Sequence, residues 1–154
     1  MKRLLIVFSA IIMSCTNVPS QKSSSMQNNA ELLASESQGG TEQPGFRIIK
    51  DETDFRNVMK AGFQLVEEGK ESSHSPEFPK NKKVIVYNLG SFRSGSHKIS
   101  QIKSISVKNN VLYVEVPAGP PSGGMEIQMI SNPWFMFAVP ADFQFTSVEL
   151  KYSK

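Results

Sequence analysis

The sequence has few of the residues on which disulfides, metal sites and nucleophilic catalysis depend. Its 154 residues include one cysteine, two histidines and one tryptophan. A single cysteine leaves no intramolecular disulfide partner, and neither His74 nor His97 has a second ligand at a spacing typical of zinc sites. No Gly-x-Ser-x-Gly elbow is present either. We therefore expect no catalytic residues, no metal ion and no cofactor, and we predict that the chain is not an enzyme.

An excess of positive charge is also lacking. The chain has 17 Lys and Arg against 14 Asp and Glu, a formal net charge of +3. Removing residues 1–14 takes away Lys2 and Arg3 and leaves 15 basic and 14 acidic side chains, or +1. The densest basic run, at residues 80–83, is too short to follow a phosphate backbone. We expect no nucleic-acid partner.

No apolar run is long enough to span a bilayer. Residues 4–13 are apolar apart from Ser9, whereas a transmembrane helix needs about 20 apolar residues. Preceded by Lys2 and Arg3, this run is typical of the hydrophobic region of an export signal. It ends in Ile-Met-Ser-Cys at residues 12–15.

This ending resembles the lipobox of bacterial lipoprotein signals, with Ile12 at −3, Ser14 at −1 and Cys15 at +1. The resemblance implies cleavage between Ser14 and Cys15, a diacylglyceryl group on the Cys15 thiol, and acylation of the new amino terminus. Two or three acyl chains anchor a protein stably, whereas one does so only marginally. The resemblance implies a lipid anchor in the cell envelope. Because Thr16 is not the Asp that retains lipoproteins at the inner membrane, we expect the outer membrane, with the protein facing the periplasm rather than the cell surface.

The chain then divides into a polar segment and an apolar one. Residues 15–45 hold the lipidated cysteine and a stretch rich in Ser, Gln, Asn, Gly and Glu, which we predict to be a disordered linker because it can bury little surface. A short helix at residues 30–34 is the alternative for part of it. Large apolar residues become dense only at residues 46–154, which we predict to be one folded domain.

Local patterns predict the elements of this domain. A strand at residues 46–50 precedes a helix that Asp51 caps, with Phe55, Val58 and Met59 on one face and Gly62 at its end. Residues 83–89 are apolar on both faces and predict a central strand. Further strands are expected at residues 97–107 (with a bulge), 111–116, 125–130, 134–139 and 146–152, with Asn109 and Asn110 as a hairpin turn. One helix on a mostly antiparallel, twisted sheet is an α+β fold.

Several of these segments resemble the C-terminal domain of PrcB-like proteins. They are residues 76–78, 84–90, 93–99, 112–117 and 132–140, so that the resemblance covers nearly all of residues 46–154. The family usually reads Thr-Gly-Gly-Tyr where this chain has Ser-Gly-Ser-His at residues 94–97, and only Gly95 is retained. The resemblance implies an accessory role, because the namesake is a lipoprotein subunit that binds and stabilises a secreted protease complex.

Three places in the domain are candidate interaction sites. The turn at residues 90–95 and the strand start after it supply Arg93, Gly95 and His97. The loop at residues 117–124 includes Pro120 and Pro121, which stiffen it, although its glycines loosen it and it could be a plain hairpin connection. Trp134 could be an interface anchor, or a core residue because its neighbours are apolar.

These observations predict a membrane-anchored, non-catalytic accessory module that binds a protein partner, with an exported protease as a candidate. An exposed edge strand or the two loops would form the contact. The alternative is a lipoprotein that binds a small ligand or an envelope polymer, such as a glycan or lipid, with Trp134 or Tyr113 as a stacking surface. A hydrolase using an unrecognised serine is a third, less favoured interpretation.

Overall fold

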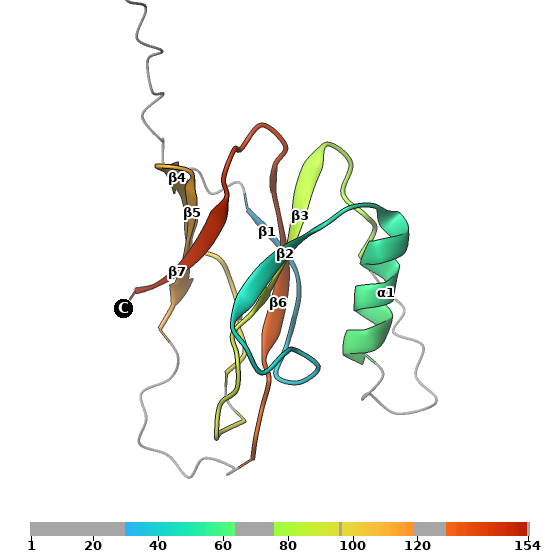
Figure 1. Ribbon diagram of the computed structural model, residues 1–154, viewed down its shortest axis with the longest axis vertical. Coiled ribbons are helices and arrows are strands. Elements are labelled where there is room, and N and C mark those ends of the chain that lie inside the picture. Colours follow the sequence, from blue (N-terminus) through green and yellow to red (C-terminus); the bar gives the residue numbers. More distant parts are fainter. Residues whose placement is uncertain (1–29, 64–75, 96, 119–128, 154) are drawn as a thin grey trace, which may run out of the picture.

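The computed structural model describes residues 30–63, 76–95, 97–118 and 129–153. Within these ranges the chain forms one α-helix and seven β-strands (Figure 1). In chain order the elements are β1 (Glu31–Glu36), β2 (Gly45–Ile49), α1 (Glu52–Phe63), β3 (Lys82–Asn88), β4 (Ser104–Lys108), β5 (Val111–Pro117), β6 (Trp134–Pro140) and β7 (Ser147–Ser153).

The described strands form two sheets rather than one. The first has the order β1-β6-β3-β2 and is antiparallel throughout. The second has the order β4-β5-β7, with β4 antiparallel and β7 parallel to β5. The predicted α+β class, with one helix on a mostly antiparallel sheet, is confirmed, and the division of the strands into two sheets is a feature that the sequence pattern did not reveal.

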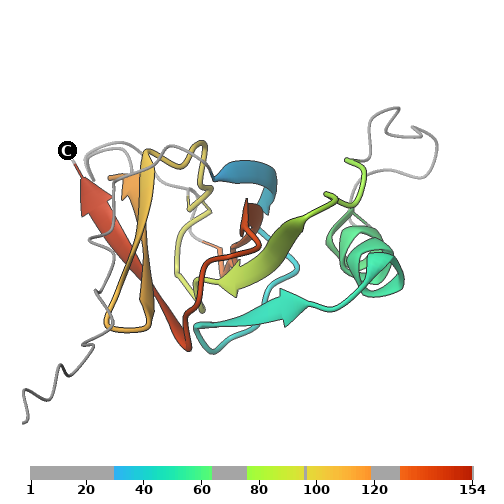
Figure 2. The ribbon, with the colours of Figure 1, turned by 90° about the horizontal axis from the view of Figure 1, so that it is seen from above.

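The two sheets and the helix lie in three layers, with the four-stranded sheet in the middle (Figures 1 and 2). Alternate residues of β3 and β6 point to opposite faces of this sheet. Ile85 and Phe137 belong to a core shared with the three-stranded sheet, whereas Val86 and Met136 belong to a second core shared with α1. Because both faces are covered, β3 and β6 have no polar face, and the prediction of a central strand at residues 83–89 is confirmed.

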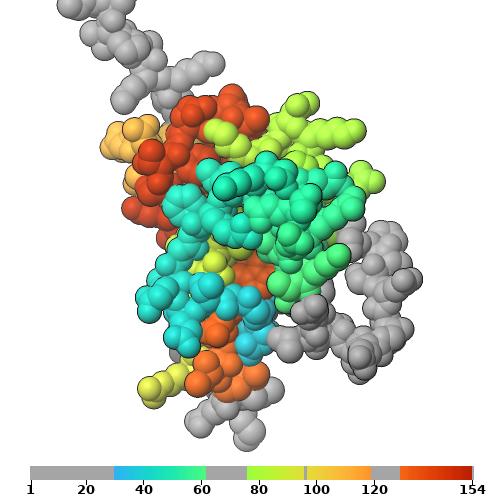
Figure 3. Space-filling view, turned by 45° about the vertical axis from the view of Figure 1, so that its right-hand side comes forward, coloured from blue at the N-terminus to red at the C-terminus, as the bar shows by residue number. Residues whose placement is uncertain are grey.

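Helix α1 begins where the sequence predicts. The Asp51 carboxylate accepts a hydrogen bond of 2.8 Å from the Asp54 backbone N–H, as an N-cap residue does. Phe55 and Met59 are buried against the sheet, and the Phe78 ring packs edge-on against Phe55 at 5.6 Å. The helix continues one residue past Gly62, to Phe63. Side chains of β2 and α1 form much of the surface in Figure 3.

The predicted boundary between linker and domain is wrong. Residues 30–45 lie in the fold, and β1 pairs with β6 from Glu31↔Ala138 to Glu36↔Trp134, with a register shift between Leu32 and Ala34. The alternative of a helix at residues 30–34 is also wrong. Leu32 packs on the core between the sheets and Ala34 on the core beneath α1. An edge strand contributes few apolar side chains, so its composition looks like that of a linker. Residues 15–29 of the predicted linker lie outside the described residues.

Two predicted strands differ from the structure. The strand expected at residues 97–107 is regular only as β4, and residues 97–103 form no strand, although the Lys103 N–H donates to the Glu115 carbonyl at 2.8 Å. Of the strand expected at residues 125–130, only Met129 and Ile130 are described, and neither is in a strand. The hairpin turn is confirmed, since Asn109 and Asn110 have φ values of 52° and 60°.

Candidate functional site

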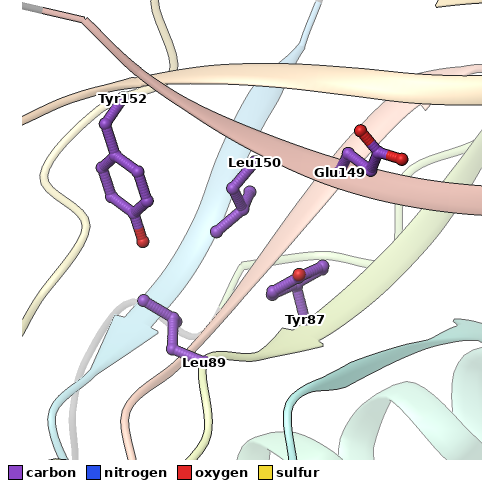
Figure 4. A pocket seen from close by; sticks show the side chains of 5 residues that line it. All are labelled: Tyr87, Leu89, Glu149, Leu150 and Tyr152. Carbon is purple, nitrogen blue, oxygen red and sulfur yellow. The ribbon is translucent and has the colours of Figure 1, made fainter.

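A cleft of about 340 Å³ opens between the two sheets. Tyr87 of β3 and Leu89, just after that strand, line one wall, and β7 supplies the other wall with Glu149, Leu150 and Tyr152. Figure 4 shows Glu149 and Tyr152 at opposite ends of the cleft, with Leu150 between them and Tyr87 and Leu89 across from them. The side chains that face the cleft are therefore two phenols and two leucines, whereas the Glu149 carboxylate is on the outer face of β7, beside its β5 pairing partner Tyr113.

The cleft exists because the packing between the sheets loosens along β7. Val148, Leu150 and Tyr152 share a face of the strand that points to the four-stranded sheet. Val148 is 7% exposed, whereas Tyr152 is 58% exposed. Near the start of β7 the sheets are joined by ring contacts, with Phe145 6.4 Å from Phe46. The sandwich is thus closed where β7 begins and open where it ends.

The opposite side of the sandwich is covered by the chain itself. Residues 97–103 lead into β4, and Ile99 is buried in the core between the sheets. The Lys98 ammonium lies 3.6 Å from the Glu36 carboxylate of β1. On the β7 side, by contrast, no strand in the described ranges pairs with the outer edge of β7. The cleft and this unpaired edge therefore adjoin each other.

Burial raises the pKa of both phenols in the cleft. It raises the pKa of Tyr87, with smaller contributions in the same direction from Tyr152 and Glu149. Burial also raises the pKa of Tyr152. Both hydroxyls therefore keep their protons at neutral pH and can donate hydrogen bonds into the cleft. The inward-facing side chains thus offer a partly apolar surface with two hydrogen-bond donors.

The other face of β7 is already occupied by contacts within the chain. The Lys151 ammonium lies 3.9 Å from the centroid of the Tyr113 ring. Beside it, the Ser104 hydroxyl donates to the Glu115 carboxylate at 2.6 Å, and this hydrogen bond is the largest cause of the lowered pKa of Glu115. This face offers less free aromatic surface, and Tyr113 has a cation over the ring that the ligand-binding alternative would use for stacking.

The structure brings Arg93, Gly95 and His97 together in one turn, and none of the three lines the cleft. Arg93 is exposed, while the His97 ring stacks on Phe92 at 3.8 Å and its Nε2 shares a hydrogen bond of 2.8 Å with the Ser94 hydroxyl. A Cβ on Gly95 would lie 3.2 Å from the Met129 sulfur. Pairing of Phe92 with Ser131 fixes the turn to the chain that enters β6. Pro120 and Pro121 lie outside the described residues.

Trp134 is a core residue, so of the two predictions made for it the core position is confirmed and the interface anchor is wrong. It is 2% exposed, and its indole N–H donates to the Gln38 carbonyl at 2.9 Å. The side chain points to the face of the sheet that α1 covers, in the same core as Met136. Since β6 is covered on both faces, its large side chains are buried and cannot contact a partner.

Sequence reasoning did not single out any of the five residues that line the cleft. They come from two strands that are far apart in the chain and belong to different sheets. Tyr87 and Leu89 read as parts of a buried strand, and the alternation of polar and apolar residues in β7 reads as an ordinary half-buried strand. Only the packing of the two sheets places these side chains beside one another.

Comparisons with models of protein families, with curated proteins and with solved structures found no match to this chain. The resemblance to PrcB-like proteins therefore stays a prediction. The described residues include no group of three or more His, Cys, Asp and Glu side chains placed to hold a metal ion. In the same part of the chain, no helix has the length and apolar character needed to cross a membrane.

Proposed function

We propose that this chain is a lipoprotein, anchored through Cys15, whose domain is a non-catalytic module that binds a protein partner. The observation that carries this proposal is the unpaired outer edge of β7 beside the cleft. An exposed edge presents free backbone N–H and C=O groups, and an extended segment of a partner can pair with them while its side chains enter adjacent pockets. The PrcB-like resemblance adds an exported protease complex as the candidate partner.

Among the sheet edges in the described ranges, β7 is the best suited to such pairing. Proteins commonly protect edge strands by making them short or by interrupting them with bulges. β2 and β4 have five residues each, and the pairing of β1 is interrupted by a register shift. β7 has seven residues in an unbroken register with β5. It is also the edge strand that contributes to the cleft.

The dimensions of the cleft keep binding of a small ligand or glycan as the second candidate function. Its volume is at the lower end of the range of about 300–1,000 Å³ for small-molecule sites. The rings predicted for stacking do not support this candidate, because Trp134 is buried and Lys151 lies over Tyr113. Tyr87 and Tyr152 would have to take their place.

Site-specific photocrosslinking in cells tests the proposal. A photoreactive phenylalanine at Tyr152, which is 58% exposed at the cleft, should yield an adduct with one defined envelope protein, identified by mass spectrometry. The matched control carries the same residue at Arg56, exposed on α1. An adduct with a non-protein envelope component would favour the ligand-binding alternative. Equal adducts from both positions, or none from Tyr152, would reject the proposal.

A further inference from the structure

We infer that the free edge of β7 is self-complementary, and that two copies of this chain pair through it, antiparallel and in a register centred on Leu150. Such two-fold pairing joins the three-stranded sheets of the two copies into one continuous sheet. The inference goes beyond the proposed function, because it depends on the residues of β7 and on no other protein. The dimer uses the same backbone groups as the proposed partner, so the two compete for this edge.

The first argument is which backbone groups of β7 face the free edge. The Ser153 carbonyl accepts a hydrogen bond of 2.8 Å from the Ala118 N–H, and the Ser147 N–H donates to the Asn110 carbonyl at 3.4 Å. Both groups therefore point towards β5 and the turn before it. The backbone groups of successive residues in a strand alternate between its two edges. Those that face the free edge belong to Val148, Leu150 and Tyr152.

The second argument is the register that these groups allow. In an antiparallel pair, two residues whose backbone groups face each other exchange both of their hydrogen bonds. Self-pairing of β7 is therefore in phase when it is centred on Glu149, Leu150 or Lys151. Centred on Leu150, it pairs every residue of Ser147–Ser153 with a residue of the other copy. Each of the other two registers leaves residues at one end of the strand unpaired.

The third argument is the charge pattern on the outer face of β7. Centred on Leu150, the pairing places Glu149 of each copy opposite Lys151 of the other, in the non-hydrogen-bonded pairs where side chains are closest. Centring on Glu149 or on Lys151 places that residue opposite its own copy. Opposite charges across a strand pair stabilise it, and like charges destabilise it. Charge therefore favours the register that also pairs the whole strand.

This charge pattern is particular to β7. The four salt bridges found in the described residues involve neither Glu149 nor Lys151. Among the edge strands in the described ranges, β1 carries acidic residues alone, β2 and β4 carry one basic residue each, and β7 carries both signs. It is thus the edge among these that complements itself.

The fourth argument is the inner face of the strand, where the same register brings apolar side chains together. Leu150 meets its own copy, and Tyr152 lies opposite Val148 of the other chain. Tyr152 is 58% exposed in the single chain, whereas Val148 is 7% exposed. Pairing would place a second apolar strand beside the exposed ring and reduce its contact with water.

Cysteine crosslinking of the purified full-length protein in detergent tests the register. One chain carries Glu149→Cys and a differently tagged chain carries Lys151→Cys, and the mixture is oxidised. The two thiols would lie on directly opposed residues, with Cα atoms about 4.5 Å apart, which a disulfide can span. We expect the mixed dimer to exceed dimers of either variant alone by about fivefold or more, because identical positions are diagonal neighbours about 7–8 Å apart. Arg56→Cys mixed with Lys60→Cys, both exposed on α1, is the matched control, and the unaltered chain controls for Cys15.

Charge reversal tests the complementarity. Sedimentation equilibrium of the full-length protein in density-matched detergent should show a monomer–dimer equilibrium. Glu149→Lys or Lys151→Glu alone should weaken the dimer about tenfold or more, the factor that corresponds to about 1.4 kcal/mol. An equal mixture of these two variants, or the double reversal in one chain, should regain the affinity to within about threefold. Arg56→Glu on α1 should leave it unchanged.

Three results would overturn the inference. They are a monomeric unaltered chain at all concentrations, reversals that weaken the dimer without rescue by the mixture or the double reversal, and crosslinking of Glu149→Cys with Lys151→Cys no stronger than the α1 control. A monomeric chain whose Tyr152 photocrosslink captures a different envelope protein would reject the dimer and leave the proposed function standing. The rescued dimer, without a Tyr152 adduct to any different protein, would support the dimer and reject the proposed function.

Discussion

Arg47 on β2 donates hydrogen bonds to both carboxylate oxygens of Asp54 in the first turn of α1. Its Nη1 lies 2.8 Å from Oδ1 and 2.9 Å from Oδ2. Asp54 also accepts a hydrogen bond of 3.3 Å from the Lys50 N–H. The contact joins the edge of the four-stranded sheet to the helix that covers it. The hydrogen bond from Arg47 is the largest cause that lowers the pKa of Asp54, and burial opposes it.

This contact predicts a stability difference that depends on pH. Arg47→Ala should lower the free energy of unfolding by about 0.5–1 kcal/mol at pH 7. The pKa of Asp54 is lower in the folded chain than in the unfolded chain. The contribution of Asp54 to the free energy of unfolding is therefore complete above the pKa of the unfolded chain, about 3.9. It is lost as the pH falls through the lower pKa of the folded chain. Urea unfolding of both proteins between pH 7 and pH 2 measures this.

The control for that measurement is Arg56→Ala. Arg56 pairs with Glu52 along the helix, and both side chains are more than half exposed. Such a pair contributes about 0.3–0.5 kcal/mol at most. If the difference between wild type and Arg47→Ala stayed constant down to pH 2, the carboxylate of Asp54 could not be its source.

The turn between β4 and β5 predicts a contrast between two substitutions. Asn109 and Asn110 both have positive φ, a conformation that costs other side chains about 1–2 kcal/mol and glycine little. Asn110→Val should therefore lower the free energy of unfolding by about that amount. Asn110→Gly should leave it unchanged within about 0.5 kcal/mol. Thermal unfolding of the two variants checks this, and equal losses would contradict the left-handed turn.

The place of β1 in the sheet predicts the shortest chain that folds. A chain that begins at Gly45 lacks β1 and leaves β6 without one of its two neighbours. It also loses Gln38, whose carbonyl accepts the Trp134 indole N–H. We expect it to show no cooperative thermal transition, whereas a chain that begins at Ala30 should melt cooperatively. Circular dichroism during heating distinguishes them, and a sharp transition of the shorter chain would contradict the role of β1.

The resemblance of residues 12–15 to a lipobox predicts where the protein is found in the cell. With Cys15→Ser the thiol that would be acylated is gone, and two or three acyl chains are what holds such a protein to a bilayer. We expect the unaltered chain in the membrane fraction and the Cys15→Ser chain in the soluble fraction or in unprocessed form. Mass spectrometry of the amino-terminal peptide should show the acyl mass on Cys15. A free thiol there would refute the anchor.

Much of the fold could be predicted because its signals are local. Asp51 caps α1 through a contact three residues away, and Asn109 with Asn110 turns the chain through its own backbone preference. The apolar run in β3 indicates burial on both faces of that strand, and the apolar run in β6 predicts a strand. Each of these features depends on neighbouring residues, and the sequence displays them directly.

The candidate site could not be predicted in the same way. Tyr152 and Tyr87 have no sequence feature that marks them, and they meet because β7 pairs in parallel with β5 and its sheet then packs on β3. The burial of Trp134 and the inclusion of β1 likewise depend on which strands lie beside β6.

The sequence by itself displayed the lipobox-like ending at residues 12–15 and determined the cap and length of the helix to within a residue, the tight turn and the central strand β3. The tertiary structure alone decided that the strands divide into two sheets, that residues 30–45 belong to the domain, and that an open cleft adjoins the edge of β7. The physical reason is that local propensity acts over a few residues, whereas burial and strand pairing are set by contacts between segments that only folding brings together.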